Sequence, residues 1–117
     1  MKSKMGDRQR LLHILESIEE IEQYTSKANF SSFLENSMMR FACVKQMEII
    51  GEAANNISEE TKNKFSKIQW RQIIGLRHIL VHEYFGIDTN LIWQIIANDI
   101  PQLKESIQKV LEQLDKK

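Results

Sequence analysis

The sequence predicts an all-α protein, an antiparallel bundle of four to five helices in a single domain that spans residues 1–117. Apolar residues recur at a spacing close to 3.6 along the chain, and no stretch alternates as a strand would. One proline and four glycines leave few positions that break helices. The polar segments between the apolar stripes are short, which favours antiparallel neighbours. A chain of 117 residues is long enough to bury one hydrophobic core.

The first two helices are expected over residues 7–24 and 32–57. Asp7 is a suitable N-cap for the first helix, because its carboxylate can accept a hydrogen bond from a free backbone N–H. Gly51 lies inside the second helix, where glycine costs about 1 kcal/mol relative to alanine. We therefore expect another helix to approach closely at Gly51. The polar segment 58–66 is expected to form a short helical turn.

The later helices are predicted from their capping residues. Ser66 and Gln69 match a capping box, and Gly86 is well placed to end the helix that begins there. Asp88 is expected to cap a fourth helix. Asp99 and Gln102 resemble a second capping box, with Pro101 in the first turn of a fifth helix that reaches the end of the chain.

Composition limits the classes of function. Sixteen basic and sixteen acidic residues give a net charge of zero, so nucleic-acid binding would require a local basic patch. The single cysteine, Cys43, cannot form an internal disulfide and fits a reducing compartment. No apolar run approaches the ~20 residues of a membrane span, and the basic N-terminus lacks the apolar region of a secretory signal. The composition predicts a soluble cytoplasmic protein without membrane contact.

The segment 77-RHILVHEYFGID-88 has more polar residues than a core helix needs. His78 and His82 are four residues apart and share one helical face. Arg77 and Tyr84 share the neighbouring face. Arg77 and His82 lie about 140° apart around the axis, since each residue turns an α-helix by about 100°. One helix does not bring these two together, which suggests that a second copy completes a site.

Three interpretations of this segment follow from the residues alone. The arginine and histidines could simply complement the negative end of a helix. His78 and His82 could bind zinc, with His13, Glu83 or Cys43 as a distant third ligand, although the paired motifs of a di-metal bundle are missing. A histidine that transfers protons and an arginine that stabilises charge on phosphate could cleave RNA without a metal, because RNA supplies its own 2′-hydroxyl nucleophile.

The pattern of Arg77, His82 and Tyr84 reads R-x4-H-x-Y and resembles the HepT toxins of the HEPN superfamily. The likeness extends over nearly the whole chain, including 48-EIIGEA-53, 70-WRQIIGLRHILVHEYFGID-88 and 99-DIPQL-103. It implies an endoribonuclease with Arg77 and His82 as catalytic residues and no cofactor. His78 stands where this superfamily often has asparagine, and becomes an auxiliary candidate.

The resemblance also implies partners. The family forms homodimers in which the two motifs line one cleft. Its partner is an MntA-type nucleotidyltransferase antitoxin, which silences the toxin by adding AMP to the tyrosine that corresponds to Tyr84. Basic residues upstream of the motif are candidates for binding the RNA substrate: Lys62, Lys64, Lys67 and Arg71. The alternative function is a non-catalytic helical partner of the nucleotidyltransferase.

Overall fold

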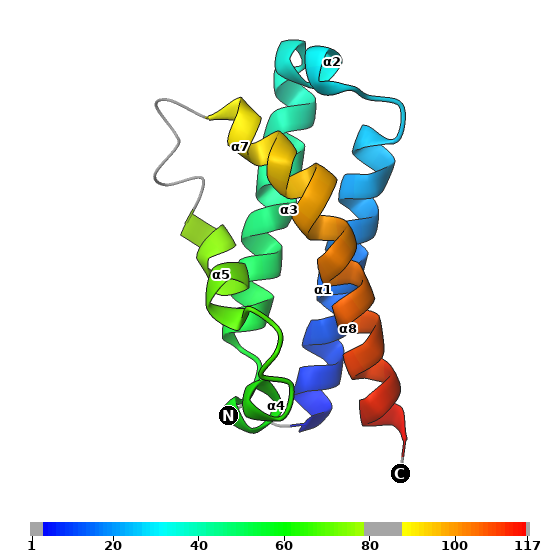
Figure 1. Cartoon of the computed structure of the whole chain (residues 1–117), viewed down its shortest axis with the longest axis vertical. Coiled ribbons are helices and arrows are strands. Elements are labelled where there is room, and N and C mark those ends of the chain that lie inside the picture. Colours follow the sequence, from blue (N-terminus) through cyan, green and yellow to red (C-terminus); the bar gives the residue numbers. More distant parts are fainter. Residues whose placement is uncertain (1–3, 79–87, 117) are drawn as a thin grey trace.

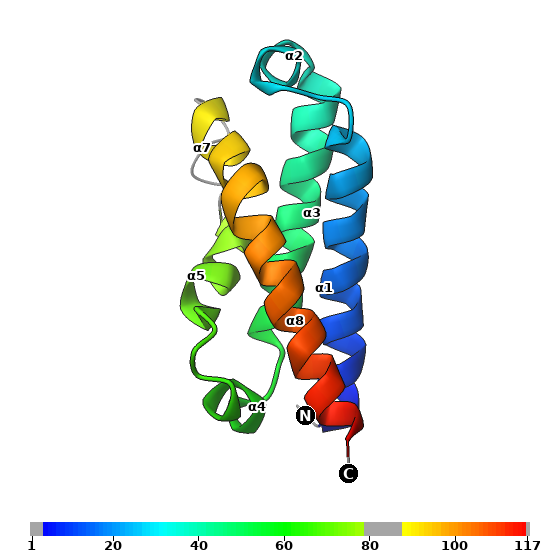
Figure 2. The same ribbon diagram turned by 45° about the vertical axis from the view of Figure 1, so that its right-hand side comes forward.

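The computed structural model describes residues 4–78 and 88–116, and every regular element in these ranges is helical. The all-α prediction is thus confirmed. Three long helices lie side by side: α1 (Lys4–Thr25), α3 (Ser37–Asn55) and α8 (Ile100–Asp115). Figures 1 and 2 show that α1 runs antiparallel to both α3 and α8.

The core lies where these three helices meet. Each helix contributes apolar side chains spaced three or four residues apart, and this spacing buries one face of each helix. The fully buried members include Leu11, Ile14, Ile18, Ile21, Met47, Ile50, Ala54 and Ile107. Within the described residues, no helix is long and apolar enough to cross a membrane.

The prediction of one helix over residues 32–57 is wrong, because the helix is interrupted at Asn36. A short helix, α2 (Phe30–Glu35), ends there and α3 begins. Asn36 has an extended conformation, and its side chain accepts a hydrogen bond from the backbone N–H of Met39 at 3.0 Å. Asparagine favours such local bonds over a place inside a helix. Phe41, in the first turns of α3, is 48% exposed and lies outside the core.

The predicted turn over residues 58–66 is confirmed as α4 (Glu59–Lys64), but the role of Asp7 differs from the prediction. Asp7 lies inside α1, fully buried, and accepts three hydrogen bonds from the start of α4. The backbone N–H and hydroxyl of Ser58 donate at 2.8 and 2.6 Å, and the Thr61 hydroxyl donates at 2.6 Å. Asp7 therefore ties α4 to α1 and does not cap its own helix.

The next segment forms α5 (Trp70–Gly75) and one 3₁₀ turn, η1 (Leu76–His78). The predicted capping box at Ser66 is wrong, since α5 begins four residues later and its N-cap, Gln69, makes no side-chain capping bond. Instead, the Trp70 indole N–H donates to the carbonyl of Phe65 at 3.1 Å and fixes the chain before the helix. The predicted helix end at Gly86 lies outside the described residues.

The last part of the chain is one continuous helix. Asp88 caps α7 (Thr89–Gln94), as predicted, by accepting from the Leu91 N–H at 3.0 Å. A π-helical turn, η2 (Ile95–Asp99), then leads directly into α8, so the predicted break at Asp99 is wrong. Pro101 has no N–H to donate and its ring crowds the preceding turn. The wider π turn accommodates this proline without ending the helix.

Candidate functional site

Arg77 and His78 lie on η1, which packs directly against α3. The closest point of this contact is Gly51, as the sequence predicted. A Cβ atom placed on Gly51 would lie 2.4 Å from the backbone nitrogen of Arg77 and 2.9 Å from its Cβ. Only glycine leaves room for this approach. The backbone of η1, and with it the start of the Arg77 side chain, is therefore fixed by α3.

The guanidinium of Arg77 has two further contacts. Its Nη1 lies 3.4 Å from a carboxylate oxygen of Glu52, and its Nε donates to Nε2 of His78 at 3.2 Å. The Arg77 side chain is 28% exposed and that of Glu52 is 60% exposed. An exposed ion pair of this kind contributes at most about 1 kcal/mol to stability. The main effect of this ion pair is to orient the guanidinium of Arg77 along the surface of α3.

These residues line a shallow, open groove of about 500 Å³. Besides Arg77, His78 and Glu52, the lining residues come from the same face of α3: Lys45, Glu48 and Ile49. Lys45 and Glu48 pair with each other at 3.0 Å. The groove thus contains two cations, Lys45 and Arg77. Guanidinium groups bind phosphate through two parallel hydrogen bonds, so Arg77 is the group best suited to a phosphate here.

His78 accepts a hydrogen bond through Nε2. The donor is Nε of Arg77, 3.2 Å away. The His78 side chain is exposed, so it can contact a bound substrate. His82 and Tyr84, the other two residues of the predicted site, lie outside the described residues. Their roles in the site, and their positions relative to Arg77, stay predictions.

The four basic residues proposed to bind RNA do not form one patch with Arg77. Lys62 and Lys64 lie on α4, at the end of the molecule away from η1 (Figure 1), where Lys62 pairs with Glu59 at 3.7 Å. Lys64 lies over the Phe65 ring, 5.7 Å from its centre. Lys67 and Arg71 are exposed and lie closer to the groove along the chain.

The described residues give little support to the zinc interpretation. They contain no group of three His, Cys, Asp or Glu side chains that could hold a metal ion. Cys43 is fully buried, and burial raises the pKa of its thiol to about 12, which disfavours the thiolate that metals bind. His13 is exposed on α1. His82 and Glu83, the other predicted ligands, lie outside the described residues.

Glu52 is a site residue that the sequence analysis missed. It follows Gly51 directly, in the segment 48-EIIGEA-53. The sequence predicted a close approach of another segment at Gly51. A charged residue beside such a contact can pair with an opposite charge on the approaching segment. That signal was available in the sequence, but the identity of the approaching residue was not.

Comparison with known families gives the class of this all-α protein: a HEPN-type ribonuclease. The family described as ribonuclease HepT-like matches residues 14–110 of this chain. The chain belongs to this family, and the enzyme class predicted from the sequence is confirmed at that level.

Known relatives agree with this assignment. A protein of Methanocaldococcus jannaschii named "Gamma-glutamylcyclotransferase and putative RNase" is 43% identical over 106 residues, which cover 91% of this chain and 48% of that protein. This chain thus spans about half the length of that relative. A "Putative RNase" of the same organism is 38% identical, with 92% and 99% covered. The "Probable ribonuclease HepT" of Thermococcus cleftensis is 37% identical, with 92% and 97% covered. No solved structure gives a significant match.

Proposed function

We propose that this protein is a metal-independent endoribonuclease toxin whose reaction takes place in the groove at η1. One observation supports this most: packing on Gly51 and the contact with Glu52 orient the guanidinium of Arg77 at an open groove. Such a preoriented cation stabilises the charge that grows on phosphate oxygens in the transition state. Removing one donor of this kind typically lowers the rate by about 10²–10³.

The proposed reaction uses the 2′-hydroxyl of RNA as nucleophile. A base removes its proton, and the oxygen attacks the neighbouring phosphorus. The bond to the 5′ oxygen then breaks, and an acid returns a proton to that leaving oxygen. His82 takes one of these two proton-transfer roles. Arg77 binds the phosphate, and His78, whose Nε2 accepts a hydrogen bond from Nε of Arg77, is an auxiliary candidate.

RNA cleavage in the presence of EDTA tests this proposal. Wild-type protein is expected to cleave RNA with EDTA present, and His82→Ala is expected to abolish cleavage. Activity that EDTA removes and zinc restores would contradict the metal-independent reaction. No cleavage under any of these conditions would favour the alternative of a non-catalytic partner.

We further propose a homodimer that places two copies of the groove together. An exposed row of side chains on α3, here called the α3 stripe, follows a helical spacing: Met38, Phe41, Lys45 and Ile49. Met38 is 81% exposed and Phe41 48% exposed, although both are large and apolar. Exposed apolar patches of this kind are typical of protein interfaces. Lys45 and Ile49 also line the groove, so a partner seated on the stripe would lie beside Arg77.

The toxin role and its control by an antitoxin belong to the same proposal. A partner nucleotidyltransferase would join the Tyr84 oxygen to the α-phosphorus of ATP and release pyrophosphate. The added AMP brings negative charge and bulk near a cationic site. Its phosphate would compete with the RNA phosphates for Arg77, as a phosphoryl group added to a protein can. Incubation with the nucleotidyltransferase and ATP should add the mass of AMP to a peptide containing Tyr84. An unchanged peptide mass would contradict this control mechanism.

The cellular setting follows from the same proposal. A protein that cleaves cellular RNA acts in the cytoplasm, and one free, buried cysteine fits that compartment. Expression in cells should slow growth, and Arg77→Ala should relieve the effect. Equal growth with both proteins would contradict the toxin role.

A further inference from the structure

A second hollow lies on the other side of the turn that carries Arg77. This hollow, here called the α5–α8 pocket, has a volume of about 220 Å³ and lies between residues 67–76 and 95–106. Leu76 lines the pocket, whereas the next two residues, Arg77 and His78, line the groove. A single turn of chain therefore separates the pocket from the groove.

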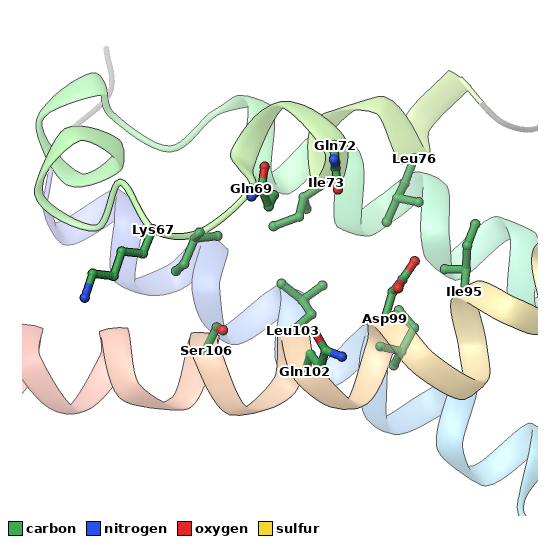
Figure 3. A pocket seen from close by; sticks show the side chains of 12 residues that line it. Lys67, Gln69, Gln72, Ile73, Leu76, Ile95, Asp99, Gln102, Leu103 and Ser106 are labelled. Carbon is green, nitrogen blue, oxygen red and sulfur yellow. The ribbon is translucent and has the colours of Figure 1, made fainter.

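The pocket has apolar walls on both sides. Ile73 and Leu76 come from the α5 side, and Ile95 and Leu103 from the other (Figure 3). Ile100, which begins α8, also lines the pocket. Pockets for drug-sized ligands typically measure about 300–1,000 Å³. A volume below that range fits one planar ring system and is too small for a whole nucleotide. A flat group would contact apolar side chains on both of its faces.

The edge of the pocket is polar. Figure 3 shows the Asp99 carboxylate pointing into the space between Leu76 and Ile95, with Gln72 on the wall of α5 and Gln102 on the wall of α8. Asp99 makes no capping hydrogen bond with its own helix. A carboxylate only accepts hydrogen bonds, whereas the glutamine amides both donate and accept. A matching ligand presents N–H donors to Asp99 and an acceptor to an amide.

The π turn contributes to this arrangement. Ile95 and Asp99 are its first and last residues, and both line the pocket. Single π turns inside α-helices occur frequently at functional sites. Lys67 also lines the pocket, from the chain that precedes α5. The Lys67 ammonium can contact a phosphate group attached to a ring that occupies the pocket.

We propose that the α5–α8 pocket receives a nucleobase of bound RNA and prefers guanine. Guanine presents two adjacent donors, N1–H and the 2-amino group, which one carboxylate can accept as parallel hydrogen bonds. Its O6 atom accepts from a glutamine amide. Uracil offers a single N–H between two carbonyl oxygens, which a carboxylate repels. RNA-binding proteins commonly read unstacked bases through such edge contacts. This proposal rests on the proposed RNA cleavage and adds base selection to it.

The test measures binding of mononucleotides, which requires no cleavage. Isotope-labelled full-length protein is titrated with guanosine monophosphate, uridine monophosphate and inorganic phosphate, and the side-chain amide signals of Gln72 and Gln102 are followed by NMR. Guanosine monophosphate should shift both signals, with an affinity about tenfold or more above that of the uridine compound, because one matched base contact contributes about 1–3 kcal/mol. Phosphate alone should shift neither.

Two variants locate the effect. Asp99→Asn should weaken binding of guanosine monophosphate about tenfold, while Asp115→Asn, which removes the same charge elsewhere on the surface, should leave it unchanged. Ser106→Phe should also weaken binding, because the ring fills the pocket from α8. Equal binding of the uridine compound, shifts confined to the groove, or no shift at all would overturn the proposal.

The outcomes also separate the two proposals. If guanosine monophosphate binds in the pocket but the protein cleaves no RNA, the base site stands and the proposed reaction fails. If RNA is cleaved but the pocket binds no base, the proposed reaction stands and base selection fails.

Discussion

Arg77 illustrates how the direction of one side chain depends on contacts at two levels. Its backbone is fixed by the packing of η1 on Gly51, and its guanidinium is oriented by Glu52 and His78. Sequence analysis identified Arg77 as a phosphate ligand through a family motif, and it identified Gly51 through helix propensity. It did not connect the two, because 26 positions separate them in the chain and neither signal names a partner.

Asp7 should be important for stability at the residue scale. Its buried carboxylate accepts three hydrogen bonds, and bonds to charged groups contribute about 1.5–3 kcal/mol each. Asp7→Asn should therefore lower the free energy of unfolding by about 2 kcal/mol or more, measured by urea denaturation. Asp115→Asn is the control, since that carboxylate is half-exposed and pairs with Arg8 at the surface. Equal stability of the two variants would contradict the role given to Asp7.

Cys43 should make stability depend on pH in the alkaline range. Burial raises the pKa of its thiol from 9.0 to about 12. Above pH 9 the unfolded chain loses this proton while the folded chain keeps it, so stability falls as pH rises toward 12. At pH 10 the loss is about 1.4 kcal/mol.

Urea denaturation of the wild type and of Cys43→Ala at pH 8 and pH 10 measures how much the Cys43 thiol contributes to this pH dependence. The variant should lose less stability between the two pH values than the wild type does. Identical pH dependence of the two proteins would show that the thiol ionises as easily in the folded state as in the unfolded chain.

At the element scale, the contact between α3 and η1 should tolerate no added methyl group. Gly51→Ala places a Cβ atom against the backbone of Arg77 and Ile74. Overpacking costs about 1–3 kcal/mol, and the better helix propensity of alanine returns up to about 1 kcal/mol. We expect a net loss of about 1–2 kcal/mol in thermal or urea unfolding, together with weaker RNA cleavage, because Arg77 must move.

Gly75→Ala provides the matched control. A Cβ atom on Gly75 would meet nothing within 4 Å, so alanine should leave stability unchanged or raise it by up to about 1 kcal/mol. If both alanine variants behave alike, the close approach at Gly51 is not what positions η1.

The helices themselves were partly predictable, and the errors have physical causes. The cap by Asp88 acts over three residues, so the local sequence is enough to predict it. The break at Asn36 was missed because the apolar spacing continues across it. The capping box expected at Asp99 was wrong because Asp99 ends a π turn that continues directly into α8, so its side chain caps no helix end. Asp7 was misassigned because its partners, Ser58 and Thr61, are distant in the sequence.

At the scale of the whole molecule, the α3 stripe predicts self-association. Met38→Asp should disrupt the proposed dimer, because a charge replaces an apolar side chain that is 81% exposed in the single chain. Light scattering should show a mass near twice 13.8 kDa for the wild type and near 13.8 kDa for the variant. Gln108→Asp, on the exposed face of α8, should leave the mass unchanged. A wild-type protein of 13.8 kDa would contradict the dimer.

The candidate site was predictable in kind but not in arrangement. The family motif indicated the residue types and the roles expected of them, and the structure places Arg77 and His78 at an open groove. The role of Glu52 and the presence of the α5–α8 pocket required the three-dimensional structure. Both depend on packing between elements that lie far apart in the chain.

The most direct test of the central claim, that RNA is cleaved at the groove with Arg77, is a comparison of cleavage rates with EDTA present. Arg77→Ala should cleave RNA at least about 100-fold more slowly than the wild type, as expected when a transition-state donor is lost. Arg8→Ala, which removes an exposed arginine paired with Asp115, should retain the wild-type rate. An Arg77→Ala protein that cleaves RNA as fast as the Arg8→Ala control would contradict the assignment of this groove as the reaction site.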